Sequence, residues 1–219
     1  MAYTKHTQSP LFRIVHVVLI CGLIGAAVTA ARAATEGEMY KGYEMPPYDV
    51  VESDGGTELR AYAPHILAEV TVRGSQSQAV SRGFQVLANY IFGGNATGQK
   101  IAMTVPVTQE PTEGASQTWT VSFMMPSSFD IATLPAARND AVRFVETEPE
   151  RLLVRGFSGF RTDKALGENA SALLKAAQAS GLTVTGAPRY FFYDGPMTPP
   201  WARRNEVAVP VRPLKETSS

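Results

Sequence analysis

Helical periodicity occurs twice in this chain, and predicted strands stand in pairs before and after each helix. Residues 75–92 form the first predicted helix, because apolar side chains recur there at spacings of four, three and four. These side chains are Val80, Phe84, Leu87 and Ile91. Residues 163–180 form the second helix, which Gly181 ends. Each half therefore reads strand–strand–helix–strand–strand, and we interpret this as an internal duplication.

The predicted strands either alternate apolar and polar residues or are rich in β-branched and aromatic residues. They cover residues 48–52, 57–62, 65–72, 101–108 and 118–125 in the first half, which is one strand more than the repeat requires, and 142–148, 151–157, 189–193 and 206–211 in the second. Short turns join most of these strands in pairs, which favours antiparallel pairing. We expect an α+β fold: a distorted, mainly antiparallel β-barrel built from the two repeats, with two flanking helices.

The first 33 residues have the layout of a secretory signal peptide. Lys5 and Arg13 precede an apolar run over residues 14–31, and Ala31-Arg32-Ala33 offers a cleavage site between small residues. We therefore expect export to a periplasmic or secreted location, with no stable membrane insertion after cleavage. An N-terminal membrane anchor is the alternative, since the run is near the lower length limit of a spanning helix.

Three further segments complete the expected organisation of the chain. Residues 34–47 are polar and then proline-rich, and are expected to be a leader segment. Residues 48–211 are expected to form the folded domain, and residues 212–219 a C-terminal tail.

Cleavage after Ala33 would change both the charge and the ligand chemistry of the protein. The whole chain carries 20 basic and 20 acidic side chains, and the first 33 residues hold three of the bases and none of the acids. The resulting excess of acid argues against a nucleic-acid-binding protein. Cys21 is the only cysteine, and His65 is the only histidine after residue 33. No disulfide and no metal site of its own are therefore expected.

Four segments of the chain resemble motifs of the SOUL/haem-binding-protein family. They are Thr57–Tyr62, Gly83–Asn95, Lys100–Val107 and Arg203–Val207, and they occur in the family's order. The resemblance covers residues 43–211. It implies a distorted antiparallel barrel with two flanking helices, which agrees with the prediction from periodicity. It also implies binding or carriage of haem or a related tetrapyrrole in an apolar groove beside the first helix, and no catalytic residues.

This resemblance indicates which residues would contact the ligand. Ser81 and Ala88 are small and would leave room for a flat ring next to Phe84 and Phe92. Met197, in the long loop before the last strand, resembles a family position that closes the groove. An ordinary, half-solvated helix flank is the alternative interpretation of these residues.

The positions where family members carry basic partners for the haem propionates are neutral in this chain. They hold Ser81, Asn89, and Thr198 or Pro199. Arg203 and Arg204 are possible substitutes. However, Arg204, Asn205 and Glu206, together with Arg60, are expected to form a structural motif at the start of the last strand.

No residue is a clear axial ligand for haem iron. The family position at which a histidine has been proposed holds Ala61, and His65 follows four residues later. His65 is the candidate axial ligand, and a hydrogen-bonded histidine at the start of a strand is the alternative. We expect haem to be contacted without a strong bond between the protein and the iron.

Two other functions are compatible with the sequence. One is binding of another apolar small molecule, since the duplicated strand–helix–strand arrangement also resembles drug-binding effector domains related to DNA-gyrase-inhibitor proteins. The other is hydrolysis in the same groove, for which the candidate groups are Glu58, Glu69, Glu206, Tyr62 and Tyr90. No spacing among these groups indicates an acid–base pair. The physiological ligand and the oligomeric state stay open.

Overall fold

The computed structural model describes residues 38–213 of the 219-residue chain. The expected signal peptide and most of the expected C-terminal tail lie outside this range. Within residues 38–213, no helix is both long and apolar enough to cross a membrane.

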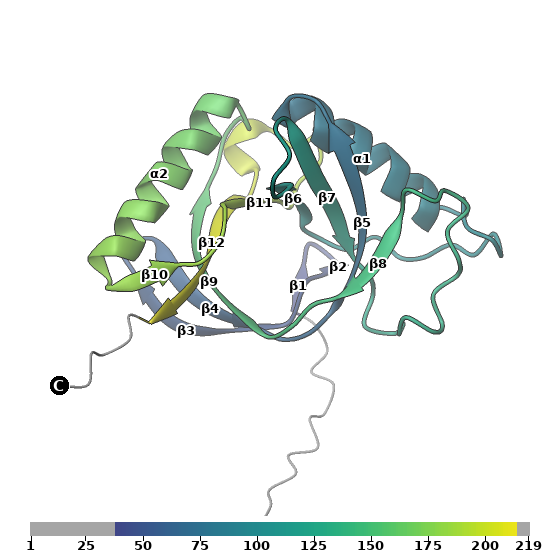
Figure 1. Ribbon diagram of the computed structural model, residues 1–219, viewed down its shortest axis with the longest axis horizontal. Coiled ribbons are helices and arrows are strands. Elements are labelled where there is room, and N and C mark those ends of the chain that lie inside the picture. The colour runs from purple at the N-terminus through teal and green to yellow at the C-terminus, as the bar shows by residue number, and fades with distance from the viewer. Residues whose placement is uncertain (1–37, 214–219) are drawn as a thin grey trace, which may run out of the picture. The chain divides into compact units, whose positions relative to one another are not determined.

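A ten-stranded sheet dominates the fold, and all of its strand pairings are antiparallel (Figure 1). Its strands are β3 (Tyr48–Asp54), β4 (Thr57–Tyr62), β5 (Ile66–Arg73), β6 (Val107–Pro111), β7 (Thr118–Met124), β8 (Arg143–Glu146), β9 (Glu150–Phe157), β10 (Leu182–Val184), β11 (Arg189–Phe192) and β12 (Asn205–Pro213). The order is β3-β4-β9-β12-β11-β6-β7-β5-β8, and β10 pairs with β12. The edge strands β3 and β8 do not pair with each other. The expected barrel-like α+β fold is thus confirmed, as a large sheet that does not close.

The strand order is symmetric about the pairing of β11 with β6. On one side follow β12, β9 and β4, and on the other follow β7, β5 and β8. The helix α1 (Gln76–Ile91) comes after β5, and α2 (Asp163–Ala179) comes after β9, which holds the equivalent position. One strand from each half of the chain pairs with the other half. The strand β4, from the first half, pairs with β9, and β8, from the second half, pairs with β5. Two related halves would produce this order; the duplication itself stays a prediction.

Both helices lie on the same face of the sheet, each over its own half (Figure 1). The main contacts of α1 are with β5 and β7, and those of α2 are with β9, β10 and β12. The hydroxyl oxygens of Ser75 and Thr162 cap the two helices by accepting hydrogen bonds from the amides of Gln78 and Ala165. The paired strands β11 and β6, which we call the seam, lie between the two helix-covered halves.

The buried face of α1 differs from the predicted apolar stripe. Leu87 and Ile91 are buried, but Phe84 is 40% exposed. The helix instead packs on the sheet through Gly83, where an added Cβ would lie 2.5 Å from Cβ of Val121 in β7. The missing side chain of this glycine allows the close approach. The predicted stripe rests on large apolar side chains only, so it does not include Gly83 and places Phe84 too deep in the core.

The chain between α1 and β6 also differs from prediction. The sequence predicts one strand over residues 101–108, whereas β6 begins only at Val107. In the preceding stretch the hydroxyl of Thr104 donates to the carbonyl of Met124 at 2.7 Å, and Thr104 forms an isolated bridge with Glu44. Pro106 cannot donate a ladder hydrogen bond, which explains why the regular strand starts after it.

Part of the expected leader belongs to the folded body. The short strands β1 (Met39–Tyr40) and β2 (Tyr43–Glu44) pair with each other, and Met45 is buried. Met45 packs in a second core on the helix-free face of the sheet, with Tyr62 and Tyr193 among its members. The main core lies between the sheet and the two helices.

The close packing at Gly83 predicts opposite effects for two glycine substitutions. Gly83→Ala should lower the free energy of unfolding by about 1–3 kcal/mol, because the new methyl group overlaps Val121. Gly167→Ala in α2 should raise it by roughly 0.5–1 kcal/mol, because a Cβ there meets no atom within 4 Å. Urea denaturation measures both values. Equal effects of the two substitutions would contradict the packing described here.

Candidate functional site

A groove of about 820 Å³ lies beside α1, over the seam; we call it the α1 groove. Val80 and Phe84 of α1 line one side, and Val107 and Phe192 of the seam line the floor. The segment Asp194–Pro196, which follows β11, bounds another side. This volume lies within the range of about 300–1,000 Å³ that is usual for small-molecule pockets. The groove exists because neither helix lies across the seam.

Three of the residues predicted for the ligand site line the α1 groove: Ser81, Phe84 and Phe92. Phe84 and Phe92 are large apolar side chains with substantial exposure, 40% and 60%. Ser81 is exposed, and its hydroxyl donates to the carbonyl of Ser77 one turn earlier. A small residue between these groups keeps this part of the groove wide.

The other four predicted site residues do not line the groove. Ala88 is only 8% exposed and belongs to the main core. Asn89 is exposed at the end of α1, where its side chain lies against Gly94. Met197 is 93% exposed, and the amide of Thr198 donates to the carbonyl of Gly195 within its own loop. The deep packing of α1 at Gly83 accounts for the burial of Ala88.

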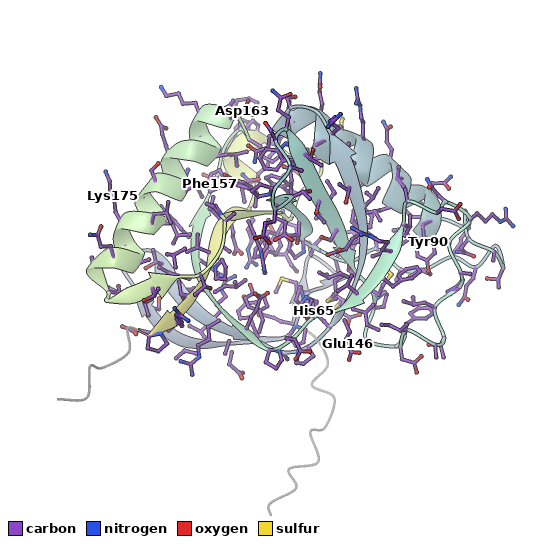
Figure 2. All side chains as sticks on the ribbon, in the orientation of Figure 1. His65, Tyr90, Glu146, Phe157, Asp163 and Lys175 are labelled. Carbon is purple, nitrogen blue, oxygen red and sulfur yellow. The ribbon has the colours of Figure 1, made fainter. Side chains whose placement is uncertain are left out.

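His65 lies on the opposite face of the sheet. It lines a pocket of about 360 Å³ on the helix-free face, which we call the inner pocket, together with Glu69 and Glu146. Figure 2 shows His65 beside Glu146 and away from the helices. Nδ1 of His65 lies 2.8 Å from the carbonyl oxygen of Ala63, and burial lowers the pKa of this histidine. His65 is therefore not among the residues that line the α1 groove.

Arg161 is a basic residue of the α1 groove that sequence reasoning missed. It is half-buried just before α2, and its Cζ atom lies 4.7 Å from the centroid of the Phe192 ring. Among residues 38–213, no carboxylate lies within ion-pair distance of its guanidinium. Burial lowers the pKa of Arg161 and the nearby charge of Arg203 lowers it further, whereas the charge of Asp194 opposes both effects. An unpaired cation at the edge of an apolar groove suits an anionic group of a ligand.

Arg203, a possible propionate partner by sequence, makes hydrogen bonds within its own loop. Its Nε and Nη2 atoms donate to the carbonyls of Thr198 and Pro196, each at 2.7 Å. Its Cζ atom lies 5.8 Å from the ring centroid of Phe160. Arg203 thus stabilises the loop between β11 and β12, beside the 3-10 helix η1 (Pro200–Ala202). Its third nitrogen, Nη1, takes part in neither of these two hydrogen bonds.

Glu206 is the centre of a buried ion network on the helix-free face. Nη1 and Nη2 of Arg60 donate to its two carboxylate oxygens at 2.9 and 3.1 Å. Arg204 donates to Oε1 through Nε and Nη2 at 3.0 and 2.7 Å, and the hydroxyl of Tyr193 donates to Oε2 at 2.8 Å. The side-chain amide of Asn205 reaches the carbonyl of Gly159 at 3.3 Å. The four residues of the expected structural motif therefore connect β4 with β12, with the loop before β12 and with the loop after β9.

The acids and tyrosines considered for hydrolysis do not meet in the α1 groove. Glu58 and Tyr62 contact Arg60 of the ion network, to which Glu206 also belongs. The hydroxyl of Tyr90 donates to the carbonyl of Pro135 at 2.8 Å. Glu69 lines the inner pocket, where burial and then the charge of Glu110 raise its pKa. None of the five lines the α1 groove.

The model of the SOUL heme-binding protein family matches residues 43–210. This chain belongs to the SOUL haem-binding family. Human Heme-binding protein 2 is 34% identical over 142 residues, which cover 62% of this chain and 66% of the human protein. Mouse Heme-binding protein 2 is 30% identical over 156 residues, which cover 67% of this chain and 75% of the mouse protein.

Among solved structures, the C-terminal domain of EcmrR shares the fold of this SOUL-family protein. The TM-score is 0.58 at 11% sequence identity, and the match covers 76% of this chain and 99% of that domain. At this identity the likeness concerns the architecture alone.

The α1 groove of this SOUL-family protein offers apolar walls for a flat ring and a basic residue for a carboxylate. Its walls are mainly apolar, and Arg161 offers a partner for a carboxylate. No histidine lines it, and within residues 38–213 no cluster of three or more His, Cys, Asp or Glu side chains is placed to hold a metal ion. Haem would bring its own iron, and the protein would supply the apolar walls and the charge.

The ion network predicts a specific response to acid. Burial alone would raise the pKa of Glu206, but the hydrogen bonds and charges of Arg60 and Arg204 outweigh it, so the pKa lies below its ordinary value of 4.5. The ionised form is thus favoured in the folded state. The resulting stabilisation is complete above about pH 4.5 and is lost as the pH falls through the folded-state pKa.

Glu206→Gln should lower the free energy of unfolding near pH 7 by roughly 3–5 kcal/mol, because the buried Arg60 and the half-buried Arg204 lose their counter-charge. It should also flatten the pH dependence of stability below pH 4.5. Glu58→Gln is the matched control, since its carboxylate is 38% exposed and its pairing with Arg60 should contribute less than about 1 kcal/mol. Urea denaturation at several pH values measures these effects. An unchanged pH slope in Glu206→Gln would disprove the assignment.

Proposed function

We propose that this protein binds haem or a related tetrapyrrole in the α1 groove and does not catalyse a reaction. The observation that carries the proposal is the combination of an apolar groove of about 820 Å³ with one unpaired arginine, Arg161, at its edge. Membership of the SOUL haem-binding family supports the same ligand class.

The walls of the groove suit a flat ring. Phe84 stands on the helix side, with its ring centroid 5.4 Å from that of Phe123 in an edge-to-face contact. Phe192 lies in the floor, and its ring is covered on one side by Arg161. A planar apolar ligand between α1 and the loop after β11 would remove exposed surface of Phe84 and Phe92 from water. Burial of apolar surface at about 25 cal/mol per Å² is the main driving force we expect.

Iron ligation by the protein is not part of the proposal. His65 belongs to the inner pocket, and the hydroxyl of the groove residue Tyr193 already donates to Glu206. Tyr43 and Met103 also line the groove, and the proposal assigns neither of them to the iron. Contact with the ring and with its carboxylates would then provide most of the affinity. Haem and the metal-free ring should consequently bind with similar strength.

Titration with haemin and with metal-free protoporphyrin IX tests this proposal. The Soret band reports haemin binding, and porphyrin fluorescence reports protoporphyrin binding. Wild type and His65→Ala should bind both compounds with dissociation constants that agree within a few-fold. Ser81→Trp should abolish binding of both, because the indole fills the groove.

Arg82→Trp is the control for Ser81→Trp, since Arg82 is exposed on α1 and does not line the groove. It should bind both compounds as wild type does. Binding of haemin alone, lost in His65→Ala, would show that iron is ligated by His65. Full binding by Ser81→Trp would place the ligand elsewhere.

A further inference from the structure

A second cavity of about 270 Å³ adjoins the α1 groove; we call it the helix-start cavity. It is lined by Gln76 and Ser77 at the start of α1 and by Arg161 and Thr162 at the start of α2. The ribbon shows both helices beginning at the same end of the domain (Figure 1), and Asp163 marks the start of α2 there (Figure 2). Val80, Ser81, Arg161 and Phe192 line both cavities, so the two are continuous.

The charges around the helix-start cavity are positive. Arg161 and Arg203 line it, and no acidic residue does. The first turn of α1 contains no acid, and Asp163 in the first turn of α2 is exposed and does not line the cavity. The free amides and the dipoles of two helix starts add positive potential at the same place.

Two polar atoms beside this cavity lack partners, which independently indicates a polar ligand. Gln109 in β6 is fully buried, and its Nε2 donates to the carbonyl of Gln76 at 2.7 Å. Its Oε1, and the Nε2 of Gln76, have no hydrogen-bond partner among the described residues. An unmatched buried donor and acceptor are costly, and a polar group bound in the cavity would satisfy them.

We propose that the helix-start cavity is a carboxylate site, and that it receives the propionate groups of the tetrapyrrole bound in the α1 groove. This inference rests on the proposed function. The carboxylates accept hydrogen bonds from the guanidinium of Arg161 and from Nε2 of Gln76. A water molecule held by a carboxylate donates to Oε1 of Gln109. Nη1 of Arg203 adds a second positive charge at the rim.

This arrangement orients the ligand. The acidic edge of the ring faces the helix starts, and the apolar edge points along α1 towards Phe92 and Met103, which line the far part of the groove. The site therefore selects tetrapyrroles with free carboxylates on one edge. Esterified or alkyl-substituted rings of the same size lose the charge-assisted hydrogen bonds, although they still fit the apolar walls.

Comparison of protoporphyrin IX with its dimethyl ester tests the inference. Wild type should bind the free acid at least about tenfold more tightly than the ester, which corresponds to one charge-assisted hydrogen bond. Arg161→Met should reduce this preference by weakening binding of the free acid while leaving binding of the ester unchanged. The substitution should not affect folding, because Arg161 has no ion pair and methionine keeps the apolar contact with Phe192. Arg82→Met, on the exposed side of α1, is the matched control and should keep the preference.

The outcomes separate the inference from the proposed function. Equal binding of acid and ester by wild type, or an unchanged preference in Arg161→Met, would overturn the carboxylate site while leaving the groove as the ring site. Binding of neither compound would overturn the proposed function and this inference with it. A thermal unfolding midpoint of Arg161→Met equal to that of wild type confirms that affinity, and not folding, has changed.

Discussion

Three residue pairs between β11 and β6 join the two halves of the sheet, and the geometry of the α1 groove depends on this short ladder. Each helix packs on its own half, so the seam has a helix on either side and none across it. Side chains alternate along the paired strands. Val107 and Phe192 point to the helix side and line the α1 groove, whereas Thr108 and Phe191 line the inner pocket. The groove is therefore a consequence of how two helix-covered halves meet.

The ion network on the helix-free face holds one wall of that groove in place. Glu206 binds Arg204 and Tyr193, which stand at the two ends of the loop between β11 and β12. Asp194 continues this connection, because its Oδ2 accepts hydrogen bonds from the amide of Arg204 at 2.7 Å and from the hydroxyl of Tyr40 at 2.9 Å. The segment Asp194–Pro196 that borders the groove thus begins at a buried, charge-paired anchor. The ion network at the start of β12 and the α1 groove are thus connected through this loop.

Much of the fold could be predicted from local patterns, because alternation and helical periodicity report burial directly. The bounds of β4 and the start of α2 at Asp163 are examples. The exposure of Phe84 could not be predicted in this way, because the close approach of α1 to the sheet depends on Gly83 and on Val121 in a distant strand. Arg161 was missed for a related reason. It comes from the second half of the chain and reaches the first helix only across the seam, so no spacing in the sequence connects the two.

Paramagnetic broadening in NMR spectra tests most directly whether a planar tetrapyrrole lies over the seam beside α1, as we propose. Manganese(III) protoporphyrin IX, with the zinc compound as diamagnetic reference, should broaden the amide signals of Ser81, Val107 and Phe192 most strongly. Those of Lys175 on the far part of α2 and of Glu146 at the inner pocket should be affected least (Figure 2). Broadening centred on Glu146 and His65 would place the ligand on the other face of the sheet and contradict the account.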